Sequence, residues 1–69
     1  MTKKDFELIA YIFNSNREDI INNMQGDRLF KIYLEDNDNT AELFSCELAL
    51  RYERFDKNRF LRACGIEIE

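Results

Sequence analysis

The sequence contains no histidine and no proline, and it has only two glycines and two cysteines. Without histidine it lacks the side chain that most often serves as a general base and as a metal ligand. Ser15, Ser45, Cys46 and Cys64 therefore have no imidazole that could activate them as nucleophiles. Two isolated glycines do not make the glycine-rich loop that cradles a phosphate. We therefore expect no catalytic residue, no metal, no cofactor and no enzyme activity.

Long apolar runs are also missing. The longest, Leu8 to Phe13, has six residues, whereas a membrane span needs roughly twenty. We expect neither a membrane span nor a cleavable leader, and a location in the cytoplasm, where Cys46 and Cys64 would stay reduced and packed. The chain of 69 residues is expected to form one domain, 1–69. A core this small often needs a partner subunit, so a homodimer is one expectation.

The first third of the chain has two segments with helical spacing. Thr2 and Asp5 have the capping-box pattern, and apolar residues recur from Phe6 at intervals of three and four. The polar run Asn14–Asn16 interrupts this pattern, and Ser15 followed by Glu18 repeats the capping-box spacing. We therefore predict a helix break there and a second helix that ends at Gly26.

The middle of the chain has both helical and strand-like spacing of its apolar residues. Leu29, Ile32 and Tyr33 have helical spacing, whereas Phe30, Ile32 and Leu34 alternate as in a strand. A helix is favoured for residues 28–35, because no second strand-like run could pair with a strand there. The choice between helix and strand at 29–34 stays open. Asp36–Asn39 is predicted to be a loop. Thr40 would cap the next helix, which is predicted from Ala41 to about Tyr52.

The last helix has the strongest local signals. Asp56 is a good N-cap, Phe55 and Phe60 have the spacing of a hydrophobic staple, and Gly65 should end the helix. A short alternating tail follows at 66–69. The expected fold is therefore all-α, a small domain of four or five helices with short connections.

Acidic residues are concentrated in the middle of the chain. Five of them form the predicted partner-binding set: Glu35, Asp36, Asp38, Glu42 and Glu47. They are expected to face solvent and could enter a basic groove of another protein. The run from Asp36 to Glu47 also has most of the ligand spacing of a calcium loop, but Ala41 stands where that loop needs glycine. A solvated acidic surface is therefore favoured over a calcium site.

Basic residues gather toward the other end. The formal net charge is −4, which disfavours non-specific attraction to nucleic acid phosphates. Between positions 51 and 62, however, basic residues outnumber acidic ones, and they are Arg51, Arg54, Lys57, Arg59 and Arg62. This strip is the one candidate for contact with nucleic acid, although basic residues on exposed helix faces are usually just a solvated surface, which is the favoured interpretation.

Two segments resemble a known group of proteins. Phe55 to Ile66 reads F-D-K-N-R-F-L-R-A-C-G-I. It is similar to the C-terminus of small uncharacterised phage and prophage proteins that share the pattern F-D-x-x-R-F-L-x-A-C-G followed by Val or Ile. Asp5 to Ala10, D-F-E-L-I-A, resembles the start of the same proteins. The segment from Met24 to Ser45 has no counterpart in that pattern.

The resemblance implies a phage origin and a short helical fold, and it supplies no activity or catalytic residue. Small acidic phage proteins of this kind often bind and block host machinery, including CRISPR effectors, restriction enzymes and nucleases. We therefore expect a protein-binding module that inhibits a host defence complex, of the anti-CRISPR kind, by occupying a basic surface. The alternative is an accessory DNA-associated protein of phage replication or recombination that uses the basic strip.

Overall fold

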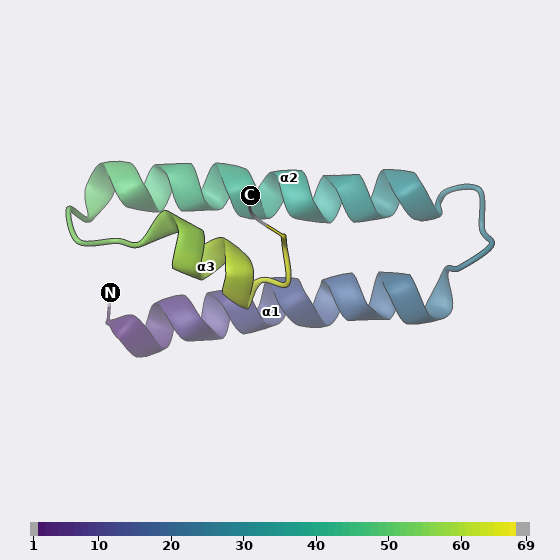
Figure 1. Ribbon diagram of the computed structural model, residues 1–69, viewed down its shortest axis with the longest axis horizontal. Coiled ribbons are helices and arrows are strands. Elements are labelled where there is room, and N and C mark those ends of the chain that lie inside the picture. The colour runs from purple at the N-terminus through teal and green to yellow at the C-terminus, as the bar shows by residue number, and fades with distance from the viewer. Residues whose placement is uncertain (1, 68–69) are drawn as a thin grey trace.

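The computed structural model describes residues 2–67 and contains three helices, α1 (Lys3–Asn23), α2 (Phe30–Arg51) and α3 (Lys57–Ala63). α1 and α2 lie antiparallel as a long hairpin, and the short α3 packs against both at one end (Figure 1). The molecule measures 41 × 19 × 18 Å along its principal axes. The all-α prediction is confirmed, whereas the expected number of four or five helices is wrong. The open choice at 29–34 resolves to helix from Phe30 onward.

The start of α1 follows the predicted capping box. The Thr2 hydroxyl oxygen accepts a hydrogen bond from the backbone N–H of Asp5 at 3.4 Å, and the Asp5 carboxylate accepts from the N–H of Thr2 at 2.8 Å. These two bonds satisfy N–H groups that have no partner inside the helix. Hydrogen bonding by the Thr2 backbone N–H, and to a smaller extent by the Thr2 side chain, stabilises the Asp5 carboxylate and holds the pKa of Asp5 below its ordinary value.

The predicted break at Asn14–Asn16 is wrong, since α1 runs through it without interruption. An asparagine inside a helix costs at most about 0.7 kcal/mol relative to alanine, so a tertiary contact can outweigh it. Here Asn16 donates its side-chain amide to the Asn37 amide oxygen at 2.8 Å, and the Arg17 guanidinium pairs with the Asp38 carboxylate at 3.1 Å. The polar run is part of the contact between α1 and α2.

The same contacts explain why the predicted loop at Asp36–Asn39 is helical. Asn37 is buried, and its side-chain N–H groups donate to the backbone carbonyl of Phe13 at 3.4 Å and to Asp38 at 3.2 Å. Thr40 does not cap a helix but donates its hydroxyl to the carbonyl of Asp36 at 2.8 Å, as threonine does inside helices. We call the four residues Asn16, Arg17, Asn37 and Asp38 the polar layer. It makes α2 one continuous helix.

The chain reverses between α1 and α2 near Gly26, where the sequence predicted the end of a helix. Gly26 has a φ of +87°, which favours glycine, and the Asp27 carboxylate accepts from the N–H of Leu29 at 2.8 Å. α2 begins at Phe30, two residues later than the helix predicted from Arg28, and ends at Arg51 instead of Tyr52. The reversal thus lies at the predicted place, although the helix begins later.

The predicted features of α3 are confirmed. The Asp56 carboxylate accepts from the N–H of Arg59 at 3.0 Å, and the rings of Phe55 and Phe60 lie 5.4 Å apart. At the other end Gly65 has a φ of +86° and donates to the carbonyl of Arg62 at 3.0 Å. The N–H of Ile66 reaches back to the carbonyl of Leu61 at 3.0 Å, which completes a Schellman motif. Ile68 and Glu69 of the predicted tail lie outside the described residues.

The apolar core lies at the end of the hairpin that α3 covers. Its buried members are Ala10, Ala41, Leu48, Phe60, Leu61 and Cys64. Around them the Phe6 ring packs edge-on against Tyr52 at 5.5 Å and against Phe55 at 5.0 Å. Such pairs add about 0.5–1.5 kcal/mol each beyond burial of their area. The segment from Phe55 to Phe60 is therefore held to α1 through Phe6 and to α2 through Phe44, whose ring stacks on that of Phe60 at 6.4 Å.

The two glycines provide a matched test of how α3 docks. An added Cβ would lie 2.4 Å from the Asn14 side-chain oxygen at Gly65 but would meet nothing within 4 Å at Gly26. Gly26→Ala should therefore cost about 1–2 kcal/mol, from its positive φ alone, and Gly65→Ala clearly more. Removing the Asn14 side chain as well should recover the difference. Urea denaturation measures all three, and equal losses for both glycines would show that Gly65 does not pack on α1.

The polar layer makes a second prediction. Asn37→Ala should lower the free energy of unfolding by about 1–3 kcal/mol, because it removes the acceptor of the Asn16 side-chain amide and the side-chain donor to the Phe13 carbonyl. Asn16→Ala added to Asn37→Ala should cost less than the sum of the two single changes. A double-mutant cycle by chemical denaturation measures this coupling. Strictly additive losses would mean that the two amides do not interact.

Candidate functional site

The predicted partner-binding acids all lie on α2, but Asp38 does not share the outer side of the helix with the other four. At about 100° per residue, Glu35 and Glu42 lie on one side of the helix and Asp36 and Glu47 on another. All four are exposed. Asp38 instead belongs to the polar layer, half-buried against Arg17, so the expectation that it faces solvent is wrong. The structure therefore brings four of the five together on the outside of α2.

The four exposed acids differ in their own ion pairs. Glu35 lies 4.0 Å from the Lys31 ammonium group, and Glu47 pairs with the Arg51 guanidinium. Exposed pairs of this i,i+4 kind contribute only about 0.3–0.5 kcal/mol, so a partner can compete with them. Neither Asp36 nor Glu42 forms an ion pair with any residue between 2 and 67.

Three large apolar side chains lie between the two pairs of acids. Ile32, Leu43 and Leu50 are 55%, 64% and 82% exposed. Their separations of eleven and eighteen residues place them within about 20° of one another around the helix. We call these three residues the outer stripe. It lies on the side of α2 opposite the buried Ala41 and Leu48, so it points away from α1 and α3.

Sequence reasoning missed the outer stripe because it divided α2 in two. With a loop expected at Asp36–Asn39, Ile32 belonged to one short predicted helix, and Leu43 and Leu50 belonged to another. The signal that could have found it is the repeat of apolar residues at 32, 43 and 50 on the side opposite Ala41. That repeat is visible only when the helix is taken as continuous.

The calcium spacing does not form a calcium site. Asp36 to Glu47 is one helical run in α2, whereas a calcium loop wraps its ligands around the ion. Between residues 2 and 67 no three His, Cys, Asp or Glu side chains are grouped so that they could hold a metal ion. No helix in the same part of the chain is long and apolar enough to cross a membrane.

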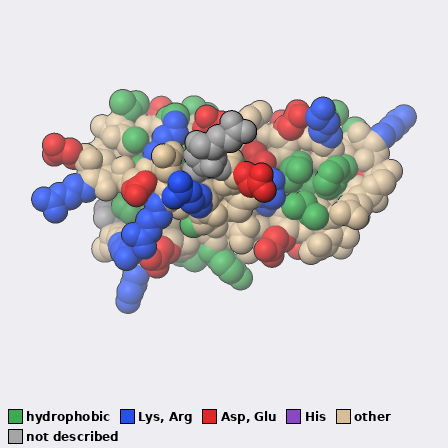
Figure 2. All heavy atoms as spheres, in the orientation of Figure 1, with side chains coloured by type: hydrophobic (Ala, Val, Ile, Leu, Met, Phe, Trp, Pro, Cys, Tyr) green, Lys and Arg blue, Asp and Glu red, His purple; other side chains and the backbone are tan. Residues whose placement is uncertain are grey.

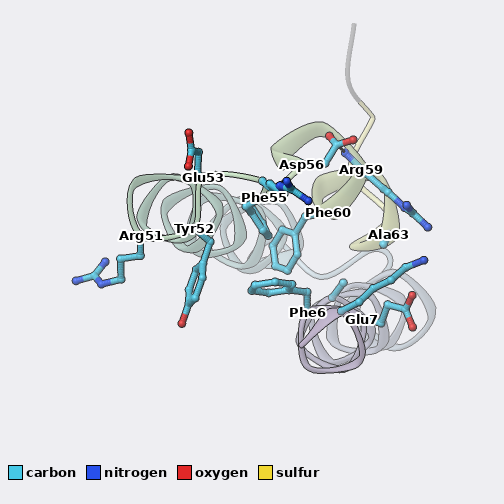
Figure 3. A pocket seen from close by; sticks show the side chains of 13 residues that line it. Phe6, Glu7, Arg51, Tyr52, Glu53, Phe55, Asp56, Arg59, Phe60 and Ala63 are labelled. Atoms are coloured by element: carbon cyan, nitrogen blue, oxygen red, sulfur yellow. Dashed lines mark hydrogen bonds between the residues drawn. The ribbon is translucent and has the colours of Figure 1, made fainter. Parts of the chain in front are cut away.

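A cleft of about 600 Å³ opens at the end of the molecule where α3 packs. Its apolar wall consists of Phe6, Tyr52, Phe55 and Phe60, which point toward one another from α1, the end of α2 and α3 (Figure 3). We call it the aromatic cleft. Sequence reasoning missed it because its walls come from segments almost fifty positions apart, and Phe55 and Phe60 were understood only as a staple.

The basic strip borders the aromatic cleft. Lys and Arg side chains gather on the half of the molecule that α3 covers (Figure 2). Arg51, Arg54 and Arg59 line the cleft together with Lys3, but Glu7, Glu53 and Asp56 line it as well. The rim therefore carries both signs of charge. Arg51, Glu53 and Asp56 point away from the Phe6 ring (Figure 3), so they do not close over the apolar wall.

The two cysteines are separate free thiols with different surroundings. Cys46 is half-buried on α2, whereas Cys64 is fully buried in the core. Burial raises the pKa of Cys64 to about 11, with a smaller contribution from Asp38. Cys64 therefore stays protonated at neutral pH and acts as a packing residue.

This difference predicts the order in which the thiols react. Because alkylation needs an accessible thiolate, iodoacetamide at neutral pH should modify Cys46 in the folded protein and leave Cys64 unmodified until the protein unfolds. Mass spectrometry of peptides after timed labelling measures both sites in one sample. Equal labelling of the two thiols in the folded state would contradict the packing of α3.

Comparison of the chain with known protein families, with curated proteins and with solved structures finds no match. The structure does add one fact about the two segments that carry the phage resemblance. They meet at the aromatic cleft, where Phe6 of the first packs on Phe55 of the second at 5.0 Å. The acids and the outer stripe lie elsewhere, on α2.

Proposed function

We propose that the chain is a protein-binding module that inhibits a host defence complex, of the anti-CRISPR kind, by occupying a basic surface of that complex. The observation that carries this proposal is the outer face of α2, where the exposed apolar stripe of Ile32, Leu43 and Leu50 lies between two pairs of acids. Exposed apolar residues clustered with charged neighbours are typical of interaction sites.

The two components of this face have different roles. The four acids, Glu35, Asp36, Glu42 and Glu47, match a basic partner in charge, which speeds encounter and fixes the orientation of binding. Burial of the three apolar side chains supplies affinity, at about 25 cal/mol for each Å² of apolar surface removed from water. A surface that evolved to bind nucleic acid is basic, and an acidic protein can occupy it in competition with nucleic acid.

The places of the segments that resemble phage proteins, and of the segment that does not, agree with this proposal. The segments that resemble phage proteins pack together around the aromatic cleft, so they form a helical frame. The segment without a counterpart, Met24 to Ser45, contains the turn and most of α2. This arrangement is expected if the helical frame is common to the phage proteins and the contact surface on α2 is particular to this chain.

The second candidate, a DNA-associated accessory protein, is supported by the basic groups at the cleft. Between residues 2 and 67, Lys3, Arg54 and Arg59 form no ion pair. They share the rim with carboxylates, however, and Phe60 is buried in the core, so it is not free to stack on a base. The outer face of α2 therefore supports protein binding better than the cleft supports DNA binding.

Charge reversal at matched positions tests the proposal. Asp36→Lys with Glu42→Lys should strongly reduce capture of a host protein from a bacterial lysate, because both acids lie on the outer face of α2 and pair with no cation among residues 2–67. Glu7→Lys with Glu53→Lys changes the net charge by the same amount at the cleft and should leave capture unchanged. Quantitative mass spectrometry compares the captured proteins, and thermal melts check that each variant is folded.

Two outcomes would contradict the proposal. Equal loss of the captured protein in both double variants would show that net charge alone matters. Capture that survives the change at Asp36 and Glu42, together with salt-sensitive retention of DNA that Arg54→Glu and Arg59→Glu abolish, would favour the DNA-associated function.

A further inference from the structure

The outer face of α2 has the periodicity of a helix–helix contact. Steps of four and three residues connect six positions along it, which are Ile32, Asp36, Asn39, Leu43, Cys46 and Leu50. Four of the six, Ile32, Leu43, Cys46 and Leu50, are apolar, whereas Asp36 and Asn39 are polar. Apolar residues at this spacing form the seam of a coiled coil, in which side chains enter gaps between residues of a facing helix. The seam covers nineteen residues of α2, and its first and last positions lie about 27 Å apart at 1.5 Å per residue.

The described parts of α1 and α3 leave this seam open to a second helix. Ile32, Leu43 and Leu50 are all more than half exposed, and α1 and α3 pack against the opposite side of α2. A single row of apolar residues is narrow, so it matches one helix better than a flat surface or a pair of helices.

The charges along the seam indicate which kind of helix it receives. Glu35 and Glu42 flank one side and Glu47 flanks the other, at the positions where coiled-coil partners place opposite charges. Asp36 lies within the seam itself and would be covered by the partner. A buried carboxylate needs a cation beside it, so the partner must bring Lys or Arg to that point.

A second copy of the chain fits this seam poorly. In an antiparallel pair the two copies of Glu42 would face each other near the centre of the contact. In a parallel pair Glu42 would face Glu47, and the two copies of Asp36 would meet inside the seam. Like charges at these positions oppose association in either orientation.

We infer that the outer face of α2 receives one amphipathic helix of another protein, with an apolar seam and with Lys or Arg on its flanks and opposite Asp36. The inference rests on the proposed function, because it names the partner chemistry for the same surface. It goes beyond that function by specifying the partner segment, which is a single helix whose apolar row and basic flanks match the seam.

A synthetic peptide tests this directly. The probe is a labelled helix of three heptads with Leu at the seam positions, one Lys opposite Asp36 and Lys at the flanking positions. One control peptide has Glu in place of the flanking Lys, and another has the composition of the probe in an order without heptads. Fluorescence anisotropy with the full-length chain should show saturable binding of one probe per protein molecule and no comparable binding of either control.

Paired variants distinguish binding at the seam from non-specific hydrophobic binding. Leu43→Ser with Leu50→Ser should weaken binding of the probe by at least about tenfold. Leu8→Ser with Ile12→Ser removes two side chains that are each 57% exposed on α1 and should leave binding unchanged. Circular dichroism and thermal melts check both variants, which should fold because all four side chains are exposed.

Several results would overturn the inference. One is failure of the probe to bind, and another is binding of either control peptide as tightly as the probe. A third is that the double change on α1 weakens binding of the probe as much as the double change on α2 does. A dimer in sedimentation that Leu43→Ser abolishes would assign the seam to a second copy instead. If no peptide binds but Asp36→Lys with Glu42→Lys still removes a captured host protein, the proposed function stands and the single-helix partner is wrong.

Discussion

The hydrogen bond between Asn16 and Asn37, at 2.8 Å, determines how α1 and α2 align along their length. With Arg17 and Asp38 it forms the polar layer, and among the described residues no buried side-chain nitrogen or oxygen lacks a partner. A shift of one helix along the other would separate these groups and leave an amide buried without a hydrogen bond. Non-directional apolar contacts tolerate such a shift far better, so the polar layer specifies the register.

Other features depend on that register. It places the start of α1 beside the end of α2, so Phe6 meets Tyr52 and Phe55 at the site where α3 docks. It directs Asn37 and Asp38 inward, which leaves the opposite side of α2 to the outer stripe and its acids. Both candidate surfaces, the aromatic cleft and the outer face of α2, therefore follow from two uninterrupted helices in one alignment.

The parts of this fold that could be predicted from the sequence are those that depend on near neighbours. The caps at Thr2 and Asp56 and the helix end at Gly65 each involve residues within five positions. The polar runs at 14–16 and 36–39 have the composition of loops, and their partners lie twenty-one positions away, so no local pattern distinguishes a loop from an interface. The acids at 35, 36, 42 and 47 were found by charge, but the apolar residues between them were hidden by the predicted loop.

Amide hydrogen exchange measured by NMR tests most directly whether the polar layer joins two continuous helices. The account predicts that the backbone amides at 14–16 and 36–39 exchange as slowly as those in the middle of the flanking helical turns, because each is held in a helix by the contact between α1 and α2. The amides of the turn at 25–28 should exchange much faster and serve as the internal reference. Exchange at 14–16 or 36–39 as fast as in that turn would contradict the account and restore the breaks that the sequence predicts.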